Sequence, residues 1–428
     1  MVAPPRGSRI VLAARLDDPR LPVEYLDSNP MATTAPRPVF AAQPSSAEIA
    51  SRAAGYSAWL EIDLDAIGRN LDRLRKRLAP GTDVMPCLKN NAYGHGLLPV
   101  AAYLAEQDVR RILVVRLREA EQLIDAGIPA RVLNMGPLFT GAQYDSVVRR
   151  GILQAVYTRD VAERLREAAE RTGADAGVFV KIDTGLRRVG VWHEEAADLI
   201  AEVAKLPRVR LEGIFSTLSQ SAEQDPVQVD RFLAVEAALR ARGIDPGLRS
   251  LASSDGTLHR PAAHLDLVRP GALLYGVYPE KKDLGSGLEL EQALALKARI
   301  EYVKWVERGD SVTYWGRFVA PERMRIATLP LGFSDGLPRE LANKARVLVG
   351  GRYQPSLGSV SLNHLVVDVT DVPAEPGDVV EAIGRRGENT LGRVAETAGW
   401  MVYSLLNHLN PTTPRVYYRG GRPVALTE

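Results

Sequence analysis

One lysine in this sequence has neighbours that could make its amine reactive. Lys89 follows the apolar run 84–88 and precedes a short turn that contains Gly94 and Gly96. An amine held at the end of a strand in a low-dielectric pocket loses part of its preference for the charged form. Such an amine can condense with an aldehyde or act as a general base. An ordinary surface lysine is the alternative, and we take Lys89 as the candidate catalytic residue.

The elements that position this lysine belong to a chain of globular composition. Its 428 residues are 46% hydrophobic and 25% charged, with a formal net charge of +2, which is enough material for two domains. Because charges of both signs are interspersed, we expect no nucleic-acid partner. No apolar run is long enough to span a bilayer, so no membrane partner is expected either. The single cysteine, Cys87, precludes an internal disulfide and is compatible with the reducing cytoplasm, where we expect the protein.

The first part of the chain differs in composition from the rest. Residues 1–55 contain clusters of proline, alanine and serine without a sustained apolar period, which predicts a disordered extension. The apolar run 10–14 is too short for the core of a signal peptide, and aspartates follow it. Met31 is a second candidate for the start codon beside Met1.

From Trp59 onward, short β-rich runs alternate with amphipathic helices over roughly 240 residues. This repeat predicts an α/β fold, a TIM (β/α)8 barrel over residues 56–296, because such barrels usually have about 250 residues. In residues 297–428 the β-rich runs are separated by Gly, Pro and Asp turns, which predicts a mainly β domain. The early strand 58–64 is expected to pair either with this second domain or with the barrel.

The segment around Lys89 reads VMPCLK followed by NNAYGHG, and it closely resembles the cofactor-lysine motif of the alanine racemase family. Further segments similar to the family's occur in the family's order over most of residues 57–420: AWLEIDLDAIGRNL, KIDTGLRRVGV, VRPGALLYG, SVTYWGRF, LPLGFSDG and GSVS. The resemblance implies a fold-type III enzyme that binds pyridoxal 5′-phosphate through Lys89. It implies an isomerase that racemises a small amino acid without a metal. It also implies a homodimer with shared active sites.

By this resemblance, two segments late in the barrel hold the phosphate of the cofactor. Ser254 lies in the polar cluster 253–256, and Gly271 and Ala272 lie in a later turn. A phosphate needs hydroxyl and backbone N–H donors. The hydroxyl of Ser254 and the backbone of Gly271 and Ala272 are therefore expected to supply them, and Tyr93 adds a second hydroxyl. The serines could equally serve as a helix N-cap, which is compatible with this role.

Arg269 matches the family's arginine that faces the pyridine nitrogen of the cofactor. Because a guanidinium keeps its proton, the ring nitrogen stays unprotonated and the electron sink is weaker. A weaker sink favours racemisation over transamination. A structural ion pair between Arg269 and Asp266 is the alternative.

Arg188, in the segment KIDTGLRRVG, matches an arginine that contacts the phenolic oxygen of the cofactor and the substrate carboxylate. Lys181 matches a lysine that is carbamylated in several family members and supports this arginine. An ordinary ion pair between Lys181 and Asp183 would give the same sequence pattern.

Racemisation needs two bases on opposite faces of the substrate's α-carbon. Lys89 supplies one of them. Tyr314, in SVTYWG, matches the family's catalytic tyrosine, which the second domain of a partner subunit provides. A phenol with a pKa near 10 needs nearby positive charge for this task, and arginines provide it. The alternative for Tyr314 is aromatic packing within the β domain.

Several positions depart from the family pattern close to the expected active site. Thr217 replaces a histidine that stacks on the cofactor ring, and Phe333 replaces a tyrosine of the substrate entry path. Asn363 replaces an aspartate, although the backbone of the preceding Leu362 could still meet the substrate carboxylate. Pro411 stands where many members have a tyrosine that contacts the phosphate.

Three interpretations remain open at this stage. The first is an amino-acid racemase, for which the sequence alone does not give the substrate. The second is a relative with altered chemistry, a biosynthetic epimerase or a decarboxylase; the absence of any cysteine after Cys87 argues against a decarboxylase. The third is a non-catalytic protein that binds pyridoxal phosphate, and the second domain with Tyr314 argues against it.

Overall fold

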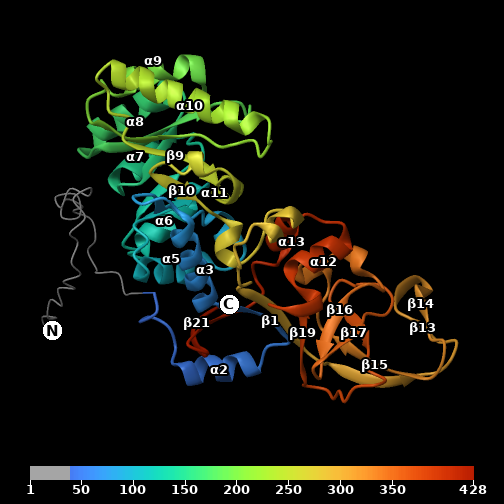
Figure 1. Cartoon of the computed structure of the whole chain (residues 1–428). Helices are drawn as coiled ribbons and strands as arrows, with labels where there is room; N and C mark the ends of the chain where they lie inside the picture. Colours follow the sequence, from blue (N-terminus) through green and yellow to red (C-terminus); the bar gives the residue numbers. More distant parts are fainter. Residues whose placement is uncertain (1–38) are drawn as a thin grey trace, which may run out of the picture. The chain divides into compact units, whose positions relative to one another are not determined.

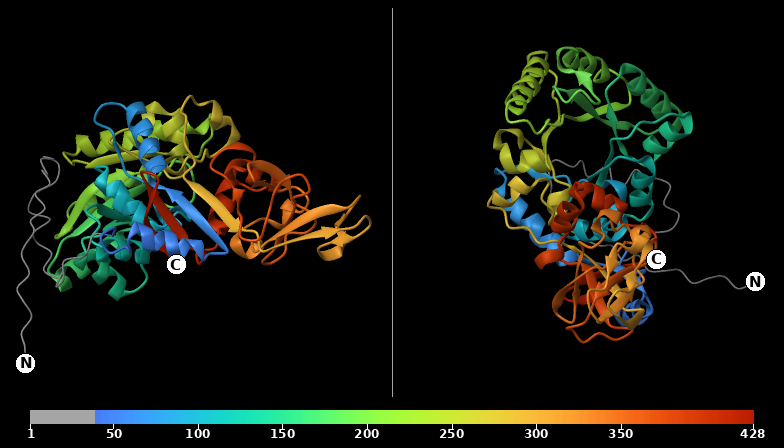
Figure 2. Two further views of the ribbon diagram at one scale, coloured as in Figure 1. Left: turned by 90° about the horizontal axis from the view of Figure 1, so that it is seen from below. Right: turned by 90° about the vertical axis from the view of Figure 1, so that its right-hand side faces the viewer.

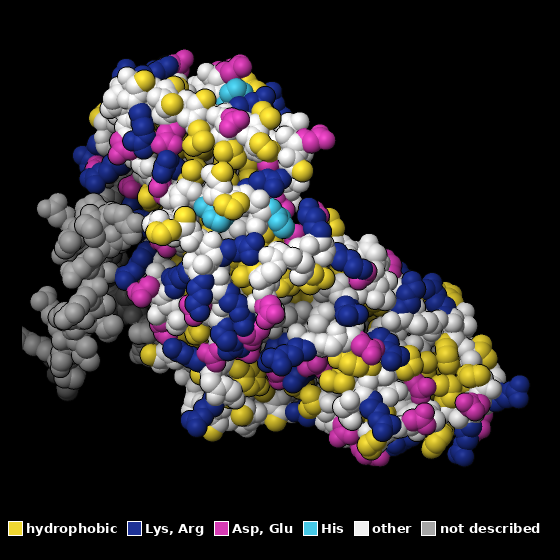
Figure 3. All heavy atoms as spheres, in the orientation of Figure 1, with side chains coloured by type: hydrophobic (Ala, Val, Ile, Leu, Met, Phe, Trp, Pro, Cys, Tyr) yellow, Lys and Arg dark blue, Asp and Glu magenta, His cyan; other side chains and the backbone are white. Residues whose placement is uncertain are grey.

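The computed structural model describes residues 39–428 (Figure 1). Both candidate start codons, Met1 and Met31, lie outside the described residues, as does most of the predicted extension. Within residues 39–428, no helix combines the length and the apolar character needed to cross a bilayer. On the face shown in Figure 3, Lys and Arg side chains lie among Asp and Glu side chains.

The predicted extension, residues 1–55, contains one described helix, α2 (Ser46–Ala54). Its first turn is capped by Ser45, whose Oγ accepts a hydrogen bond from the N–H of Glu48 at 3.2 Å. Ile49 is fully buried in a small cluster with Trp59, and this cluster lies on the second domain's sheet. The prediction of disorder is therefore wrong for α2, because a single well-buried residue does not produce the apolar period on which the prediction relied.

A parallel barrel forms the first half of the fold. Its eight strands are neighbours in the order β2-β10-β9-β8-β6-β5-β4-β3, and β7 (Val191–Trp192) pairs with β6 outside this path. A parallel bridge between Cys87 and Leu113 joins the segment after β2 to β3 and so closes the ring. The predicted TIM barrel is confirmed. The strands are β2 (Asp83–Val84), β3 (Arg111–Val114), β4 (Arg131–Asn134), β5 (Leu153–Val156), β6 (Ala176–Asp183), β8 (Val209–Phe215), β9 (Leu248–Ser253) and β10 (Leu267–Arg269).

Amphipathic helices surround these strands, as Figure 2 shows from two further directions. In α8 the residues Ala162, Leu165 and Ala169 are buried at helical spacing, and Gly173 ends the helix with a φ of 75°. The barrel helices are α3 (Leu64–Arg77), α5 (Leu97–Glu106), α6 (Leu117–Asp125), α7 (Gly141–Arg149), α8 (Arg159–Thr172), α9 (His193–Val203), α10 (Gln224–Ala241) and α11 (Ser254–His259).

A mainly β domain follows, as predicted. Its largest sheet has the strand order β17-β16-β19-β11-β1-β20-β21, and a smaller sheet has the order β12-β15-β18. The large sheet contains β17 (Arg352–Pro355), β16 (Arg346–Val349), β19 (Val379–Ile383), β11 (Leu294–Arg299), β1 (Ala58–Asp63), β20 (Arg415–Arg419) and β21 (Arg422–Thr427). The small sheet contains β12 (Tyr302–Val306), β15 (Met324–Leu329) and β18 (Leu365–Asp368), and β13 (Ser311–Val312) pairs with β14 (Phe318–Val319). Two helices of this part are α12 (Leu391–Ala398) and α13 (Val402–His408).

Strand β1 pairs with the second domain, although it precedes the barrel in the sequence. It runs antiparallel to β11, with Ala58 opposite Ala298, and parallel to β20, with Leu60 opposite Arg415. The expectation that the early strand could pair with the second domain is confirmed. The domain boundaries at residues 56–296 and 297–428 stay a proposal, since β1 belongs to the later sheet by its hydrogen bonds.

Candidate active site

The barrel residues that the sequence singled out lie at the carboxyl ends of strands. Lys89 follows the segment that begins with β2, and Arg188 follows β6. Ser254 comes directly after β9, and Arg269 is the last residue of β10. Because parallel strands end on one face of a barrel, this face is where TIM-barrel enzymes have their active sites.

Strand β6 contains an unusual pair of charges for a barrel strand. All eight of its residues are buried, including Lys181 and Asp183. Asp183 accepts two backbone hydrogen bonds through Oδ1, from Gly185 at 2.9 Å and from Arg187 at 3.1 Å. No ion pair joins Lys181 to Asp183 within 4.0 Å, so the simple ion-pair alternative for Lys181 does not hold in this geometry.

A left-handed turn ends the first strand segment directly after Lys89. The four residues from Asn90 to Tyr93 have φ values between 53° and 55°, a conformation that costs about 1–2 kcal/mol for each non-glycine residue. Glu119 stabilises the turn by accepting from the N–H of Asn91 at 3.1 Å, and the side chain of Asn91 accepts from the N–H of Leu97 at 2.8 Å. The turn directs Tyr93 back toward Lys89, whose Nζ lies 5.6 Å from the centre of the tyrosine ring.

Four positively charged side chains come together at this end of the barrel, and we call them the cation cluster: Lys89, Lys181, Arg188 and Arg269. The charges of the other three members all act on Lys181. Burial, followed by the charges of Arg269 and Arg188, lowers the pKa of Lys181 to about 8. In the part of the chain that the structure describes, no member has an ion pair with a carboxylate within 4.0 Å. The cluster is therefore suited to an anionic ligand.

Arg269 is held in place by neutral oxygen atoms. It is almost fully buried, and it donates to the hydroxyl of Ser250 and to the carbonyl of Ser216, both at 2.5 Å. The side chain of Thr217 accepts a longer hydrogen bond from it, at 3.3 Å. Burial lowers the pKa of Arg269 to about 10, which still keeps the guanidinium charged at neutral pH. Thr217, which is predicted to replace the family's histidine, thus contacts this arginine directly.

The predicted alternative for Arg269, an ion pair with Asp266, is wrong. Asp266 pairs with Arg249 instead, with Oδ2 accepting from Nε at 2.8 Å. Arg249 also donates to Glu236 at 2.9 Å. Arg249 lies near the start of β9 and Asp266 directly precedes β10, whereas Arg269 is at the end of β10. The guanidinium of Arg269 is therefore left for the site.

The predicted phosphate donors lie close together. The N–H of Gly271 donates to the hydroxyl of Ser254 at 3.0 Å. A Cβ atom placed on Gly271 would lie 2.6 Å from the hydroxyl of Tyr93, so the backbone and this phenol approach each other closely. Ala272 begins the 3-10 turn η2 (Ala272–Tyr275), and its N–H has no acceptor within that turn. Burial raises the pKa of Tyr93 well above its usual value, so its hydroxyl remains a donor.

One aromatic hydroxyl beside these donors was not predicted. The ring of Tyr403, in α13, lies 6.1 Å from the ring of Tyr93, and burial raises its pKa as well. The family resemblance places a phosphate-contacting tyrosine at the position of Pro411, and in this structure the tyrosine next to the predicted donors is Tyr403. No local sequence pattern predicts this position, because the contact depends on the packing of α13 against the turn after Lys89.

Two predicted site residues are not brought to the barrel within one chain. Tyr314 is 65% exposed in the short turn η4 (Tyr314–Gly316), and Leu362 is 54% exposed in a loop of the second domain. The carbonyl of Tyr314 accepts from the hydroxyl of Ser359 at 3.1 Å, which fixes its backbone and leaves the phenol free. The replacement Asn363 donates to the hydroxyl of Ser334 at 2.8 Å, and Phe333 is 40% exposed.

Family models match both halves of the chain. The model described as "Alanine racemase, N-terminal domain" matches residues 62–279, and "Alanine racemase, C-terminal domain" matches residues 293–417. Among curated relatives, the alanine racemase of Carboxydothermus hydrogenoformans is 35% identical over 366 residues, which cover 84% of this chain and 99% of the relative. The alanine racemase of Desulfovibrio desulfuricans is 36% identical over 365 residues, 84% of this chain and 97% of the relative.

Solved structures share the same arrangement. The alanine racemase of Clostridium difficile superposes with a TM-score of 0.83 at 29% identity, over 87% of this chain and 99% of the other. The alanine racemase of Bacillus anthracis, solved with bound L-Ala-P, gives a TM-score of 0.80 at 26% identity, over 87% of this chain and 97% of the other.

Proposed function

The chain belongs to the alanine racemase family and is a pyridoxal-phosphate-dependent amino-acid racemase, and we propose that it interconverts the two enantiomers of alanine. The substrate is inferred from the names of its relatives, which match nearly their whole length. The observation that supports the proposal most strongly is the cation cluster without carboxylate partners, next to Tyr93 and Ser254. A phosphate on one side and an amino-acid carboxylate on the other would supply the missing negative charge.

The donors of the site fit pyridoxal phosphate. Tyr93 keeps its proton, and among residues 39–428 its hydroxyl donates a hydrogen bond to the thiol of Cys87 at 3.8 Å, which is a weak partner. Ser254 and the N–H of Ala272 complete a donor set for the phosphate. When bound, pyridoxal phosphate supplies an electron-accepting ring that makes the α-proton of the substrate acidic. Arg269, charged and buried, would face the ring nitrogen and keep it unprotonated.

Two side chains would move the proton. Lys89 takes or returns it on one face of the α-carbon, and Tyr314 acts on the other face. Arg188 orients the substrate by binding its carboxylate through a bidentate pair of N–H groups, and the backbone of Leu362 adds a contact. Because each face has its own base, a proton removed from one face of the α-carbon is replaced by a proton on the other face. The product therefore has the opposite configuration.

A homodimer with shared active sites is part of the proposal. Its support is the position of Tyr314, whose phenol is exposed in η4, between β13 and β14, and these strands lie at the end of the second domain that is away from the barrel (Figure 1). A second copy of the chain would have to bring this phenol to the barrel. We also propose a cytoplasmic location, which the buried and unpaired Cys87 fits.

The test is proton NMR in deuterium oxide on the purified, cofactor-loaded protein with L-alanine and a panel of other L-amino acids. We expect the α-proton signal of alanine to disappear while the chiral purity of the amino acid falls. The matched control is the Lys89→Ala chain, which should do neither. Exchange of the α-proton without loss of chirality would contradict the proposed reaction. Exchange with a different amino acid only would contradict the proposed substrate.

A further inference from the structure

Three side chains of metal-ligand type lie together behind the phosphate donors. Asp255 and His259 are on α11, and Asp283 is on the 3-10 helix η3 (Lys281–Gly285). One potential ligand atom from each residue lies within 4.8 Å of the other two. None of the three belongs to the cation cluster or has a role in the proposed racemisation.

Asp255 is a buried carboxylate without a partner. Its residue is only 4% exposed, and in residues 39–428 its side chain has no hydrogen bond and no ion pair. A buried carboxylate without a hydrogen bond is unfavourable, and a cation bound among the three side chains would offset this cost.

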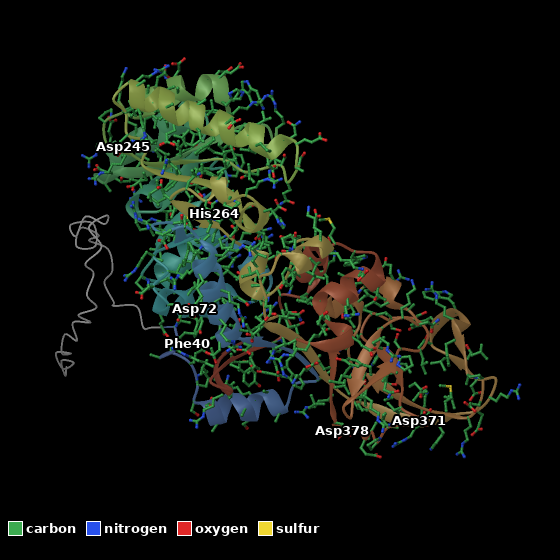
Figure 4. The ribbon with its side chains drawn as sticks, in the orientation of Figure 1. Phe40, Asp72, Asp245, His264, Asp371 and Asp378 are labelled. Atoms are coloured by element: carbon green, nitrogen blue, oxygen red, sulfur yellow. The ribbon has the colours of Figure 1, made fainter. Side chains whose placement is uncertain are left out.

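The other two ligands are already oriented. Asp283 is fully buried, and its Oδ2 accepts from the N–H of Glu280 at 2.8 Å. Its Oδ1 lies 2.7 Å from Nε2 of His259. The turn after α11 is held by His264, labelled in Figure 4, whose Nε2 lies 3.1 Å from the carbonyl of Thr257. The helix that presents Asp255 and His259 is thereby packed against its neighbours.

We propose that Asp255, His259 and Asp283 bind one divalent transition-metal ion, with Zn²⁺ as the best match. One imidazole nitrogen and two carboxylate oxygens are ligands that zinc accepts, at bond lengths of about 2.0–2.2 Å. Small movements of these side chains would bring their ligand atoms, which lie within 4.8 Å of one another, to this distance from one ion. Mg²⁺ and Ca²⁺ prefer oxygen ligands alone. Asp255 directly follows Ser254, so the ion would reduce the repulsion between two buried carboxylates and a phosphate bound at the neighbouring donors.

The experiment is isothermal titration calorimetry with ZnCl2 on the cofactor-loaded protein after removal of metals with EDTA and dialysis. We expect one equivalent of Zn²⁺ to bind. The affinity should fall by at least about tenfold in Asp255→Asn and in His259→Gln, because each variant removes one of three ligands. His364→Gln is the matched control: it removes an exposed imidazole that pairs with Glu301 at 3.1 Å and has no third ligand.

Thermal melting separates binding from folding. Zn²⁺ should raise the melting temperature of the parent chain but not that of Asp255→Asn, while both chains unfold cooperatively in EDTA. The proposal is overturned if Zn²⁺ fails to bind the parent, or if it binds all three variants equally. It is also overturned if His259→Gln melts at a lower temperature in EDTA while Zn²⁺ leaves the melting temperature of the parent unchanged. The imidazole would then stabilise the fold through its pair with Asp283 and not by binding a metal ion. None of these outcomes depends on racemase activity, so failure of the proposed function would be recognised separately.

Discussion

The guanidinium of Arg415 donates from Nε to the carbonyl oxygen of Gly94 at 2.8 Å, so a strand near the end of the chain is bonded to the turn that follows Lys89. Arg415 is only 2% exposed. Its other donors also meet backbone carbonyls of one loop, those of Asn410, Pro411 and Thr413. Among residues 39–428 this buried cation forms no ion pair with a carboxylate, and it ties a loop of the second domain to the left-handed turn of the barrel.

Replacement of Arg415 by Met should therefore lower the free energy of unfolding by at least about 2 kcal/mol, because several buried carbonyls lose their donor. Urea unfolding of the cofactor-free chain measures this change. Arg419→Met is the control on the same strand, since Arg419 forms an exposed ion pair with Glu106, and exposed pairs contribute about 0–1 kcal/mol. Equal losses in the two variants would contradict the role given to Arg415.

The second prediction concerns the pH dependence of stability at Lys181. Its pKa is lowered to about 8 in the folded chain, from 10.5. Between these pH values the amine of Lys181 is protonated in the unfolded chain and neutral in the folded chain. Stability therefore rises as pH increases from about 8 to about 10.5. The free energy of unfolding should rise by about 3 kcal/mol over this range. Below pH 8 the full cost of burying the charged amine of Lys181 is present.

Lys181→Met removes this titration. In the cofactor-free protein, the variant should be more stable than the parent at pH 7, and the difference should shrink between pH 8 and pH 10. Urea unfolding at several pH values measures it, and titrating groups that do not interact with Lys181 cancel in the difference. A constant difference across this range would show that Lys181 titrates normally.

Tyr314→Phe should leave cofactor binding intact and slow α-proton exchange by about 10²–10⁴-fold, the usual loss for one general acid or base. Deuterium exchange at the α-carbon of alanine measures the rate, and the visible absorbance of the lysine-bound cofactor reports binding. Tyr302→Phe is the control, because Tyr302 is also exposed on the second domain, at 57%. Loss of the cofactor absorbance in Tyr314→Phe would mean that its role is structural.

Shared active sites make a further prediction for mixed chains. When Tyr314→Phe and Lys89→Ala chains are mixed and allowed to exchange subunits, half of the dimers should be mixed. Each mixed dimer has one complete site, so roughly a quarter of the parent's activity should return. Racemisation after subunit exchange, with mixed dimers verified by differently tagged chains, measures it. Mixed dimers without any activity would exclude a site built from two chains.

The barrel and the β domain could be predicted because their signals are repeated along the chain. Alternating strands and helices predicted the barrel. Active-site residues lie at the C-terminal ends of barrel strands, and this rule predicted the places of Ser254 and Arg269. The left-handed turn from Asn90 to Tyr93 could not be predicted in this way, because four consecutive non-glycine residues with positive φ are unfavourable locally and depend on distant partners such as Glu119. The contact of Tyr403 with Tyr93 is likewise a product of tertiary packing, which no local pattern contains.

The last prediction tests the phosphate donors through Gly271. A Cβ atom at this position would lie 2.6 Å from the hydroxyl of Tyr93, so Gly271→Ala forces the phenol away from the donor group. Crowding of this kind typically costs about 1–3 kcal/mol, and we expect the dissociation constant of pyridoxal phosphate to rise by about tenfold. Titration of the cofactor-free protein, followed by cofactor absorbance, measures the constant. Gly285→Ala is the control, because a Cβ there meets no atom within 4 Å. Unchanged affinity in Gly271→Ala would mean that the phosphate is held by other groups, whereas an equal loss in both variants would point to a general effect on folding.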